Sequence, residues 1–454
     1  MTNKSYCKKL KYNPVFAAIV AANMAYSATA FSQEETIKQD QASEETVVEE
    51  KEESLEIITV TATKRDTSLM NTPIAISAFT EDQLNKIGIK NVQDLNNVIP
   101  NMSIMTDRES SAPIITMRGV RSTNTTEWGD PAVGVHYDGI YSPRPQGALS
   151  LMFDVERVEA LRGPQGTLFG RNSTVGSLNI ISAKPKLDEV EGKIEFEVGQ
   201  DNQQAIKGVL NLPVSESFAL RGAFYKETKD SNLNGYYDPN QWDQRYLNYD
   251  QSELTPITEG ITPSDRDPSN RSFFNDNLYQ PVKADPSNFY NNKDQYAFRL
   301  SGLYSPSADL SWQLTFERFV DEGAGGAAQK DCDRIKDRPA EYGGSCTDIW
   351  GSEDNNAVYV NIPGEVDMTL DSVRSSFSYA VTDDVEFSYL AGFQSQERTG
   401  QVDLDQGMYF WDQMLKWVDT DYDSWSHELQ LKSTGDGPLQ WIGGYFNFKE
   451  ENSM

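Results

Sequence analysis

A short glycine-rich stretch, residues 153–185, constrains the fold of this chain more than any other segment. Residues 155–161 alternate between apolar and polar side chains, which predicts a half-buried strand. Residues 178–181 predict its partner strand, which ends at Lys184 and Pro185. Glycine adopts positive φ and lets two backbones approach closely, so the stretch predicts two strands joined by a tightly folded connector. The glycines of this connector are Gly163, Gly166, Gly170 and Gly176.

A phosphate-binding loop is the alternative interpretation of these glycines. Such loops need a Gly-Lys-Ser/Thr sequence or the spacing G-x-G-x-x-G, because backbone amides and a lysine hold the phosphates. Neither pattern occurs in residues 153–185. We therefore expect no nucleotide site here.

Residues 156–172, ERVEALRGPQGTLFGRN, resemble the signature region of the plug domain of TonB-dependent outer-membrane receptors. Residues 114–120 resemble the Ile-Arg-Gly motif of that family, and residues 133–141 its Tyr-x-Asp-Gly-Val-Tyr motif. Residues 173–178 depart from the family, which more often has paired glycines and an alanine there. The resemblance implies an α+β plug domain inside a transmembrane antiparallel β-barrel.

The composition of the chain limits its partners. The formal net charge of −29 argues against nucleic acid, whose phosphates require a basic surface. Beyond the N-terminus no apolar run is long enough for a membrane-spanning helix. Contact with outer-membrane lipid therefore requires a barrel, because only a closed sheet satisfies its backbone groups in lipid.

The N-terminal residues are typical of an exported protein. Residues 1–32 predict a cleaved signal peptide, with lysines before an apolar core and small residues at the cleavage positions. Residues 33–55 are rich in Glu, Gln, Ser and Lys, and predict an acidic disordered linker. With the resemblance, these features predict the outer membrane of a Gram-negative bacterium.

The next segment, residues 56–62, is β-branched, apolar and uncharged past its first residue, which suits a strand without a fixed partner. It resembles the TonB box of the family, which a TonB-type inner-membrane energy-coupling protein grasps. Strand addition would carry the pull through backbone hydrogen bonds. The alternative is that it is the first strand of the next domain. The box consists of Glu56, Ile57, Ile58, Thr59, Val60, Thr61 and Ala62.

Residues 66–185 predict the plug domain itself. Residues 73–79 alternate as a strand, and Thr80 with Gln83 predicts a capping box at the start of a helix. Residues 92–99 predict a second short helix, which Pro100 stops. Residues 114–120 and 133–141 predict further strands.

Two arginines, Arg118 and Arg162, precede glycines in strands that we expect to be buried. A buried arginine needs a carboxylate or several carbonyl groups. The resemblance implies that both pair with glutamates on the barrel wall and latch the plug. The alternative is pairing within the plug, for example with Glu156 or Glu159, and the sequence favours neither.

Residues 189–454 predict the N-terminal portion of an outer-membrane barrel with long extracellular loops. Short polar turns alternate with long connections, and aromatic residues gather towards segment ends, as outer-membrane barrels require. Nine segments are too few for the twenty-two strands of the family, so the barrel is expected to be incomplete in this chain. The alternating segments are residues 193–198, 205–212, 218–226, 294–304, 310–320, 372–380, 385–394, 424–432 and 439–448.

Two cysteines, Cys332 and Cys346, follow the predicted signal peptide. An even number in an oxidising compartment predicts one disulfide that closes a short loop. Metal binding is the alternative, but neither cysteine has a neighbouring Cys or His at ligand spacing.

Together these features predict TonB-dependent import of a scarce solute, above all an iron–siderophore complex. Haem, cobalamin and oligosaccharides are alternative cargoes, and a passive adhesin or structural barrel is an alternative class. The ligand-binding residues are not identified by the sequence. No hydrolase motif such as G-x-S-x-G or H-E-x-x-H occurs, so we expect neither an enzyme nor a cofactor.

Overall fold

The computed structural model describes residues 58–65, 67–89, 91–106, 113–122, 129–144, 152–237, 282–326, 357–360, 363–403, 415–435 and 437–453. These residues form a sheet of nine long strands, called the wall below, and a smaller α+β part that precedes it in the chain. We keep the name plug region for the smaller part.

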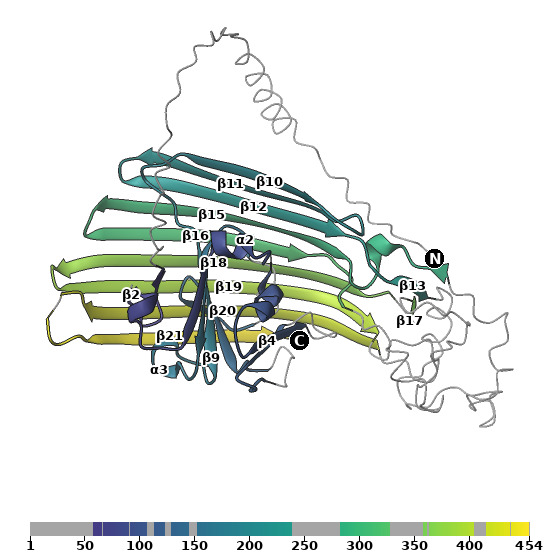
Figure 1. The fold of residues 1–454 in the computed structure, drawn as a ribbon, viewed down its shortest axis with the longest axis horizontal. Helices are drawn as coiled ribbons and strands as arrows, with labels where there is room; N and C mark the ends of the chain where they lie inside the picture. Colours follow the sequence, from purple (N-terminus) through teal and green to yellow (C-terminus); the bar gives the residue numbers. More distant parts are fainter. Residues whose placement is uncertain are drawn as a thin grey trace, which may run out of the picture. The chain divides into compact units, whose positions relative to one another are not determined.

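The wall strands lie side by side in chain order, and each pairs antiparallel with the next (Figure 1). Among the described residues, the first and the last strand each pair with a single neighbour, so this sheet is open. The strands are β10 (Glu191–Val198), β11 (Gln204–Ser215), β12 (Phe218–Lys229), β15 (Lys293–Ser307), β16 (Leu310–Asp321), β18 (Glu365–Thr382), β19 (Val385–Asp403), β20 (Leu415–Ser433) and β21 (Ile442–Ser453).

Each of the nine predicted wall segments corresponds to a strand, but the last, residues 439–448, begins before its strand, because β21 starts at Ile442. Several strands are longer than their alternating segments: β19 reaches Asp403, beyond residues 385–394, and β20 begins at Leu415, before residues 424–432. Towards these ends the sequence no longer alternates regularly between apolar and polar residues, although the backbones of the two strands stay paired. A small sheet of β13 (Asn234–Tyr237), β14 (Val282–Lys283) and β17 (Ala357–Val360) lies beyond the ends of the wall strands.

The wall has two chemically different faces. One face carries buried residues in period two, such as Arg221 and Ala223 on β12 and Glu317 and Phe319 on β16. The other face exposes large apolar side chains, including Phe224, Phe298, Leu300, Trp312, Leu314, Leu429 and Leu431. An exposed apolar face opposite a polar, covered face is typical of a sheet that meets lipid on one side.

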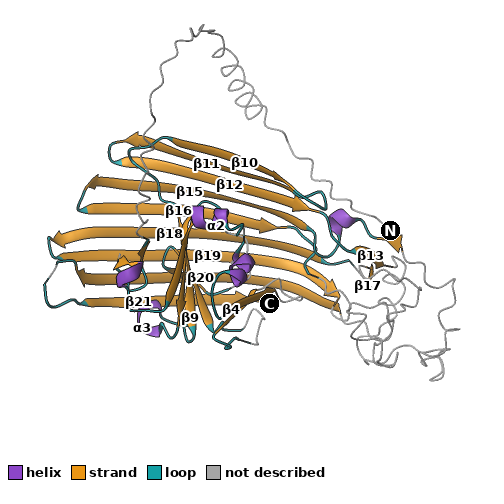
Figure 2. Cartoon of the chain, viewed as in Figure 1, coloured by secondary structure: helices purple, strands orange, loops and turns teal. Residues whose placement is uncertain are grey.

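The plug region is built on a five-stranded sheet in the order β3–β8–β9–β6–β7. Figure 2 shows its short strands and helices against the long strands of the wall. Its strands are β3 (Ile76–Thr80), β6 (Val133–Tyr137), β7 (Ile140–Ser142), β8 (Val155–Arg162) and β9 (Gly176–Ser182). Two short pairs complete it, β1 (Thr59–Val60) with β2 (Thr67–Ser68), and β4 (Met102–Thr106) with β5 (Pro113–Met117).

The helices of the plug region are short. They are η2 (Leu69–Asn71), α2 (Glu81–Lys86), η3 (Val92–Asn97) and α3 (Gly166–Phe169). A further short helix outside the plug region, η8 (Pro286–Asn288), precedes β15 in the chain. The predicted capping box is confirmed, because the Thr80 side chain accepts from the Gln83 amide and the Gln83 side chain accepts from the Thr80 amide. No helix in the described part of the chain has the length and apolar character needed to cross a membrane.

The strand pair expected around the glycine connector is confirmed: β8 pairs antiparallel with β9. Residues 133–141 differ from the prediction, because they form a hairpin of β6 and β7 and not one strand. Asp138 and Gly139, with φ of 52° and 79°, form its two-residue turn. Two successive residues with positive φ reverse an antiparallel pair, and Asp-Gly is a preferred sequence for this turn.

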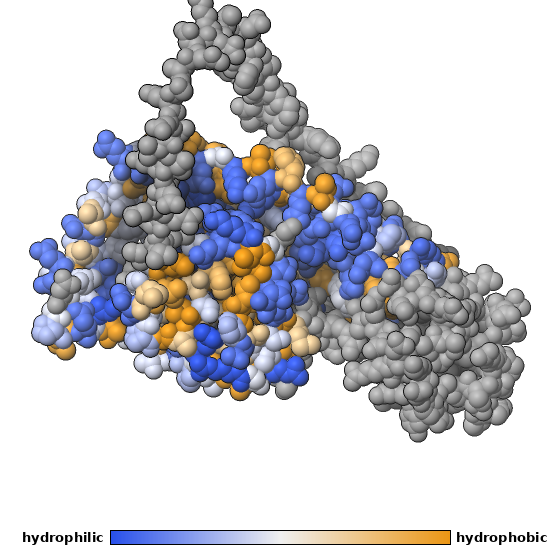
Figure 3. Space-filling view, in the orientation of Figure 1, coloured by the Kyte–Doolittle hydropathy of each residue, from blue (hydrophilic) through white to orange (hydrophobic). Residues whose placement is uncertain are grey.

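The main hydrophobic core joins the plug region to the wall. It contains Leu84, Leu95, Val158 and Ile180 of the plug region together with Val209, Ala223, Ala297, Phe319, Met368 and Leu370 of the wall. A separate cluster lies around Val60, Ala62, Ala78, Leu161 and Phe169. In the space-filling view, hydrophobic and hydrophilic patches alternate over the visible face of the plug region (Figure 3).

Replacement of Gly176 by alanine tests the tight connector. A Cβ at Gly176 would overlap with the Sδ atom of Met117 and the carbonyl oxygen of Leu161, whereas a Cβ at Gly166 would meet nothing within 4 Å. We expect Gly176→Ala to lower the free energy of unfolding of the plug region by about 1–3 kcal/mol, as overpacking does. Pulse proteolysis in guanidinium chloride measures this change.

Gly166→Ala is the matched control, with an expected change within about 0.5 kcal/mol. Equal midpoints for the two variants would show that the connector is not closely packed at Gly176.

Candidate functional site

A buried ion pair at the start of β8 joins the plug region to the wall. Asp154, in the left-handed region at φ 51°, precedes the strand and is 2% exposed. Arg221 of β12 donates to both of its carboxylate oxygens, from Nε at 2.9 Å and from Nη2 at 2.6 Å. The second Nη atom of Arg221 donates to Glu191 at 3.0 Å. This two-pronged geometry is the strongest form of the arginine–carboxylate interaction.

Two more wall arginines extend this contact across the sheet. Arg299 donates to the carbonyl oxygens of Phe153 and Asp154, at 3.1 and 3.0 Å, and to Glu317 at 2.6 Å. Arg374 donates to the same Glu317 oxygen at 2.8 Å and to Asp138 of the β6–β7 turn at 2.9 Å. We call Asp138, Asp154, Arg221, Arg299, Glu317 and Arg374 the anchor cluster.

A second contact lies between the other side of the plug region and β21. Glu450 accepts from Arg144 and, at 3.4 Å, from Arg171. The Arg171 guanidinium lies 4.9 Å from the centroid of the Phe448 ring and also donates to Asp130. A hydrogen bond from Asn172 and the charge of Arg171 lower the pKa of Asp130, so this carboxylate is ionised.

The predicted latch residues are placed differently from the expectation. Arg118 is exposed and has φ of 53°, because Arg118 and Gly119 form a tight turn after β5, and the prediction of a buried Arg118 is wrong. Arg162 is half-buried, and its Nε has no hydrogen-bond partner among the described residues.

The two predicted internal partners also contact a different arginine. Arg157 donates to Glu159 at 2.8 Å and forms an ion pair with Glu156. Within the described residues neither Arg118 nor Arg162 forms an ion pair with Glu156 or Glu159, so these two example partners are not the ones used.

The described part of the box, residues 58–62, is docked on the plug region. Thr59–Val60 pairs with Thr67–Ser68, so the expectation of a strand without a fixed partner is wrong. Val60 and Ala62 are fully buried, and their burial explains the docking, since removing apolar surface from water is favourable. Glu56 and Ile57 lie outside the described residues.

One buried carboxylate, that of Glu159, holds Thr61 near the end of the box. It accepts from the Thr61 amide at 3.0 Å and from the Thr61 hydroxyl at 3.1 Å. Glu159 is 0% exposed and also accepts from Arg157 and Asn179. The fully buried carboxylate is therefore stabilised by several donors, of which two belong to the box.

Two residues shortly after the box, Lys64 and Arg65, bind the wall. Lys64 forms an ion pair of 3.2 Å with Glu428 of β20, and its ammonium lies 5.1 Å from the centroid of the Phe169 ring. Arg65 donates to the carbonyl oxygens of Ser433 and, at 2.7 Å, of Trp441. These contacts join the box segment directly to β20 and to the turn that follows it.

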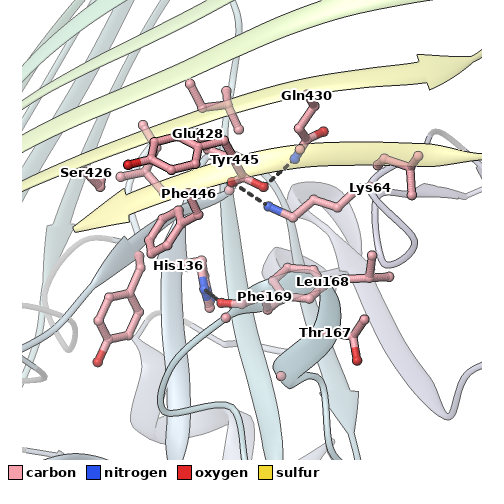
Figure 4. A pocket seen from close by; sticks show the side chains of 18 of the residues that line it. Lys64, His136, Thr167, Leu168, Phe169, Ser426, Glu428, Gln430, Tyr445 and Phe446 are labelled. Carbon is pink, nitrogen blue, oxygen red and sulfur yellow. Dashed lines mark hydrogen bonds and ion pairs between the residues drawn. The ribbon is translucent and has the colours of Figure 1, made fainter.

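A cavity of about 370 Å³ separates this segment from the last wall strands (Figure 4). In Figure 4 Lys64 extends from the plug side towards Glu428, beside Gln430 and the aromatic residues of β21. The glycines Gly166, Gly170, Gly443 and Gly444 form part of its lining.

His136 lies at the base of this cavity and is 1% exposed. Its Nε2 faces the carbonyl oxygen of Phe169 at 3.3 Å, so this nitrogen carries the proton and donates, while Nδ1 accepts from Ser177 at 2.9 Å. Burial, assisted by the charge of Lys64, lowers the pKa of His136 to about 3. His136 is therefore neutral at physiological pH, and both of its nitrogens have partners.

Other expectations lie outside the described residues or find no support in them. Cys332 and Cys346 fall outside the described residues, so their disulfide stays a prediction. The described ranges hold no cluster of three His, Cys, Asp or Glu residues that is arranged to bind a metal ion. The glycines Gly163 and Gly170 have φ of 123° and 74°, as a tight connector requires.

The wall arginines were not identified by sequence reasoning. Arg221, Arg299 and Arg374 each occupy a position on the covered face of an alternating strand. A charged residue at such a position is a signal for a buried partner, but the sequence does not say which one.

Comparison with known proteins identifies the plug region. Residues 68–177 match the family model of the TonB-dependent Receptor Plug Domain. The plug region therefore belongs to the plug-domain family of TonB-dependent receptors. This is a family of outer-membrane proteins, so the predicted outer-membrane location and the predicted plug-and-barrel fold class are confirmed.

Individual relatives agree with this assignment. The receptor is 29% identical over 168 residues to a pesticin receptor of Yersinia enterocolitica, over 36% of this chain and 24% of that protein. It is 28% identical over 220 residues to a ferripyoverdine receptor of Pseudomonas aeruginosa, over 46% of this chain and 25% of that protein. The chain thus spans about a quarter of the length of these curated relatives.

Solved structures show the same fold. The structure of the ferric yersiniabactin uptake receptor of Yersinia pestis has a TM-score of 0.61 at 17% identity. The match covers 84% of this receptor and 49% of that chain. At this identity the likeness supports the fold alone.

Removal of the Glu159 carboxylate tests how the box is held. We expect Glu159→Ala to accelerate trypsin cleavage after Lys64 or Arg65 by about tenfold or more, because a hydrogen bond to a charged group contributes about 1.5–3 kcal/mol. Mass spectrometry of timed digests of the purified receptor measures the rate.

Glu156→Ala is the matched control, because Glu156 also pairs with Arg157 but its side chain is 42% exposed. Its cleavage rate should equal that of the unchanged receptor. Identical rates in both variants would exclude Glu159 as the residue that holds the box.

Proposed function

We propose that this receptor imports a scarce solute across the outer membrane, driven by a TonB-type inner-membrane protein that pulls on residues 56–62. The observation that carries the proposal is the unequal attachment of the plug region. Its box is held by a two-residue strand pair, a small apolar cluster and one carboxylate, whereas its sheet is tied to the wall by the anchor cluster. A pull on the box can therefore release it before the plug sheet separates from the wall.

An iron–siderophore complex is the cargo that the relatives support best. They include a ferripyoverdine receptor and a ferric yersiniabactin uptake receptor. Both names refer to ferric chelates, and both proteins share the plug-and-wall fold with this receptor. No enzymatic activity is proposed, since the family consists of transport receptors.

Three further roles belong to the same proposal. The outward apolar face of the wall contacts outer-membrane lipid. The extracellular ligand, a ferric siderophore, binds above the plug region before transport. Arg162, whose Nε has no hydrogen-bond partner among the described residues, is proposed to latch the plug through a glutamate of the wall, as the resemblance implies.

A proline at Ile58 tests the motor contact. Proline removes the backbone N–H that strand addition needs, so we expect Ile58→Pro to abolish energy-dependent uptake and to leave ligand binding at the cell surface intact. Uptake and surface binding of iron-loaded siderophore from the spent medium of the native organism are measured in iron-limited cells.

Ile58→Ala is the control, because it keeps the backbone donor and should retain uptake. Unimpaired uptake by Ile58→Pro would remove the box from the mechanism. If the unchanged receptor neither binds nor imports any iron chelate, the cargo belongs to another class.

A further inference from the structure

The exposed apolar face of the last wall strands carries its side chains in rows. Strands β18 to β21 lie side by side, and residues paired across them on one face form a row (Figure 1). Two of these rows are rich in aromatic and aliphatic residues. The row nearer the short turns contains Phe377, Tyr389, Leu429 and Tyr445, and the row farther from them contains Val373, Phe393, Trp425 and Lys449.

A polar row lies between these two rows. It consists of Ser375, Ala391, His427 and Asn447. Ser375 accepts a hydrogen bond from Nε1 of Trp312 at 3.0 Å, whereas His427 and Asn447 are exposed. We call His427 and Asn447 the polar pair. They interrupt the apolar face with apolar or aromatic residues on both sides of them.

The polar pair has hydrogen-bonding groups that the described residues leave unpaired. The Tyr389 hydroxyl has no other acceptor there, so it donates to Nδ1 of His427 at 2.8 Å, and the neutral ring carries its proton on Nε2. Neither this Nε2 nor the Asn447 amide has a hydrogen-bond partner in the described part of the chain. Unpaired polar groups in hydrocarbon are costly, so their presence at membrane depth indicates a polar partner.

A cation lies next to the polar pair on β21. Lys449 is two residues beyond Asn447 on the same face, and its ammonium lies 5.2 Å from the centroid of the Trp425 ring. Lys449 also pairs with Glu451, but the two side chains are 65% and 59% exposed, and exposed ion pairs are weak. Glu451 and Asp423 form the next row. This surface therefore favours an anion at Lys449, with hydrogen-bond acceptors on the side of the polar pair and not beyond it.

We propose that Lys449, Asn447 and His427 bind one phosphorylated lipid of the outer leaflet. Its phosphate lies against Lys449, the carbonyl and hydroxyl groups of its linkage region bind the polar pair, and its acyl chains cover the row that contains Leu429. Lipid A carries phosphate, amide and ester carbonyls with hydroxyls, and alkyl chains in this order. This inference rests on the part of the proposed function that places the outer face in lipid.

Binding of added lipid A to the purified receptor in detergent tests the site, with native mass spectrometry as the measurement. We expect His427→Leu and Asn447→Leu each to weaken binding about three- to tenfold, because each removes one hydrogen bond to the lipid. Leucine suits a lipid-facing position, so both variants should insert and fold as the unchanged receptor does. Unchanged binding in both variants would overturn the proposal.

Two lysines of the outer face separate this site from a general attraction of anions. Lys449→Leu should weaken binding of lipid A about threefold or more, as loss of a charge-assisted contact does. Lys226→Leu on β12 is the matched control, since Lys226 is 55% exposed but has Phe224 where Lys449 has Asn447. Its binding should not change. Equal losses in the two variants would show that any cation on this face suffices, which contradicts the proposal.

Glu451→Gln should change binding in the opposite direction. It frees Lys449 and removes a nearby negative charge, so binding of lipid A should strengthen about threefold, as expected for an exposed charge. Binding of dephosphorylated lipid A should stay the same. Weaker or unchanged binding of lipid A would mean that the occupant is not anionic. A receptor dimer that His427→Leu dissociates would mean that a second copy occupies the row. Either result overturns the proposal.

The lipid site and the proposed import fail separately. The binding measurements contain neither cargo nor an energy source, so a negative result there refutes the lipid site and leaves import intact. Transport by Ile58→Pro refutes the proposed motor contact and leaves the lipid site intact.

Discussion

Two carboxylates between the plug region and the wall determine how the rest of this structure is held together. Asp154 is buried and the Asp138 side chain is 20% exposed, and a charge that loses water in this way is tolerated only when it is paired and hydrogen-bonded. The wall supplies this compensation through Arg221 and Arg374, while Arg299 holds the backbone beside Asp154. The plug sheet therefore has one favourable position against strands β12–β18. This position also determines where the other elements of the plug region lie.

As a result, different parts of the plug region are attached with different strength. The anchored side combines ion pairs with the main hydrophobic core, whereas residues 58–65 depend on a small cluster, one carboxylate and the contacts of Lys64 and Arg65. Arg144 and Arg171 add a further contact with the wall at Glu450. Local opening follows the weakest set of contacts. Residues 58–65 are therefore the part of the plug region that we expect to open most easily.

Much of the fold could be predicted from the sequence. The wall segments alternate between apolar and polar residues, which favours strands, and the glycine connector favours a tight turn between two strands. The capping box at Thr80 and the β8–β9 pair were predicted for the same local reasons. The partners of charged residues could not be predicted. Alternation places Arg374 on the covered face of its strand, but it does not say that Asp138 is the carboxylate that Arg374 binds. The prediction that Arg118 lies in a buried strand was wrong. The apolar residues before it favour a strand, whereas the positive φ of Arg118 places it in a tight turn.

A double-mutant cycle at Asp154 and Arg221, with native-state hydrogen exchange of the β8–β9 amides as its measure, tests the anchoring most directly. Asp154→Asn and Arg221→Met should each lower the free energy of opening by about 3 kcal/mol or more, because each leaves a buried group unpaired. The double variant should cost little more than one single variant, which is the sign of coupled residues. Strictly additive effects, or single effects below about 0.5 kcal/mol as at exposed pairs, would contradict the account.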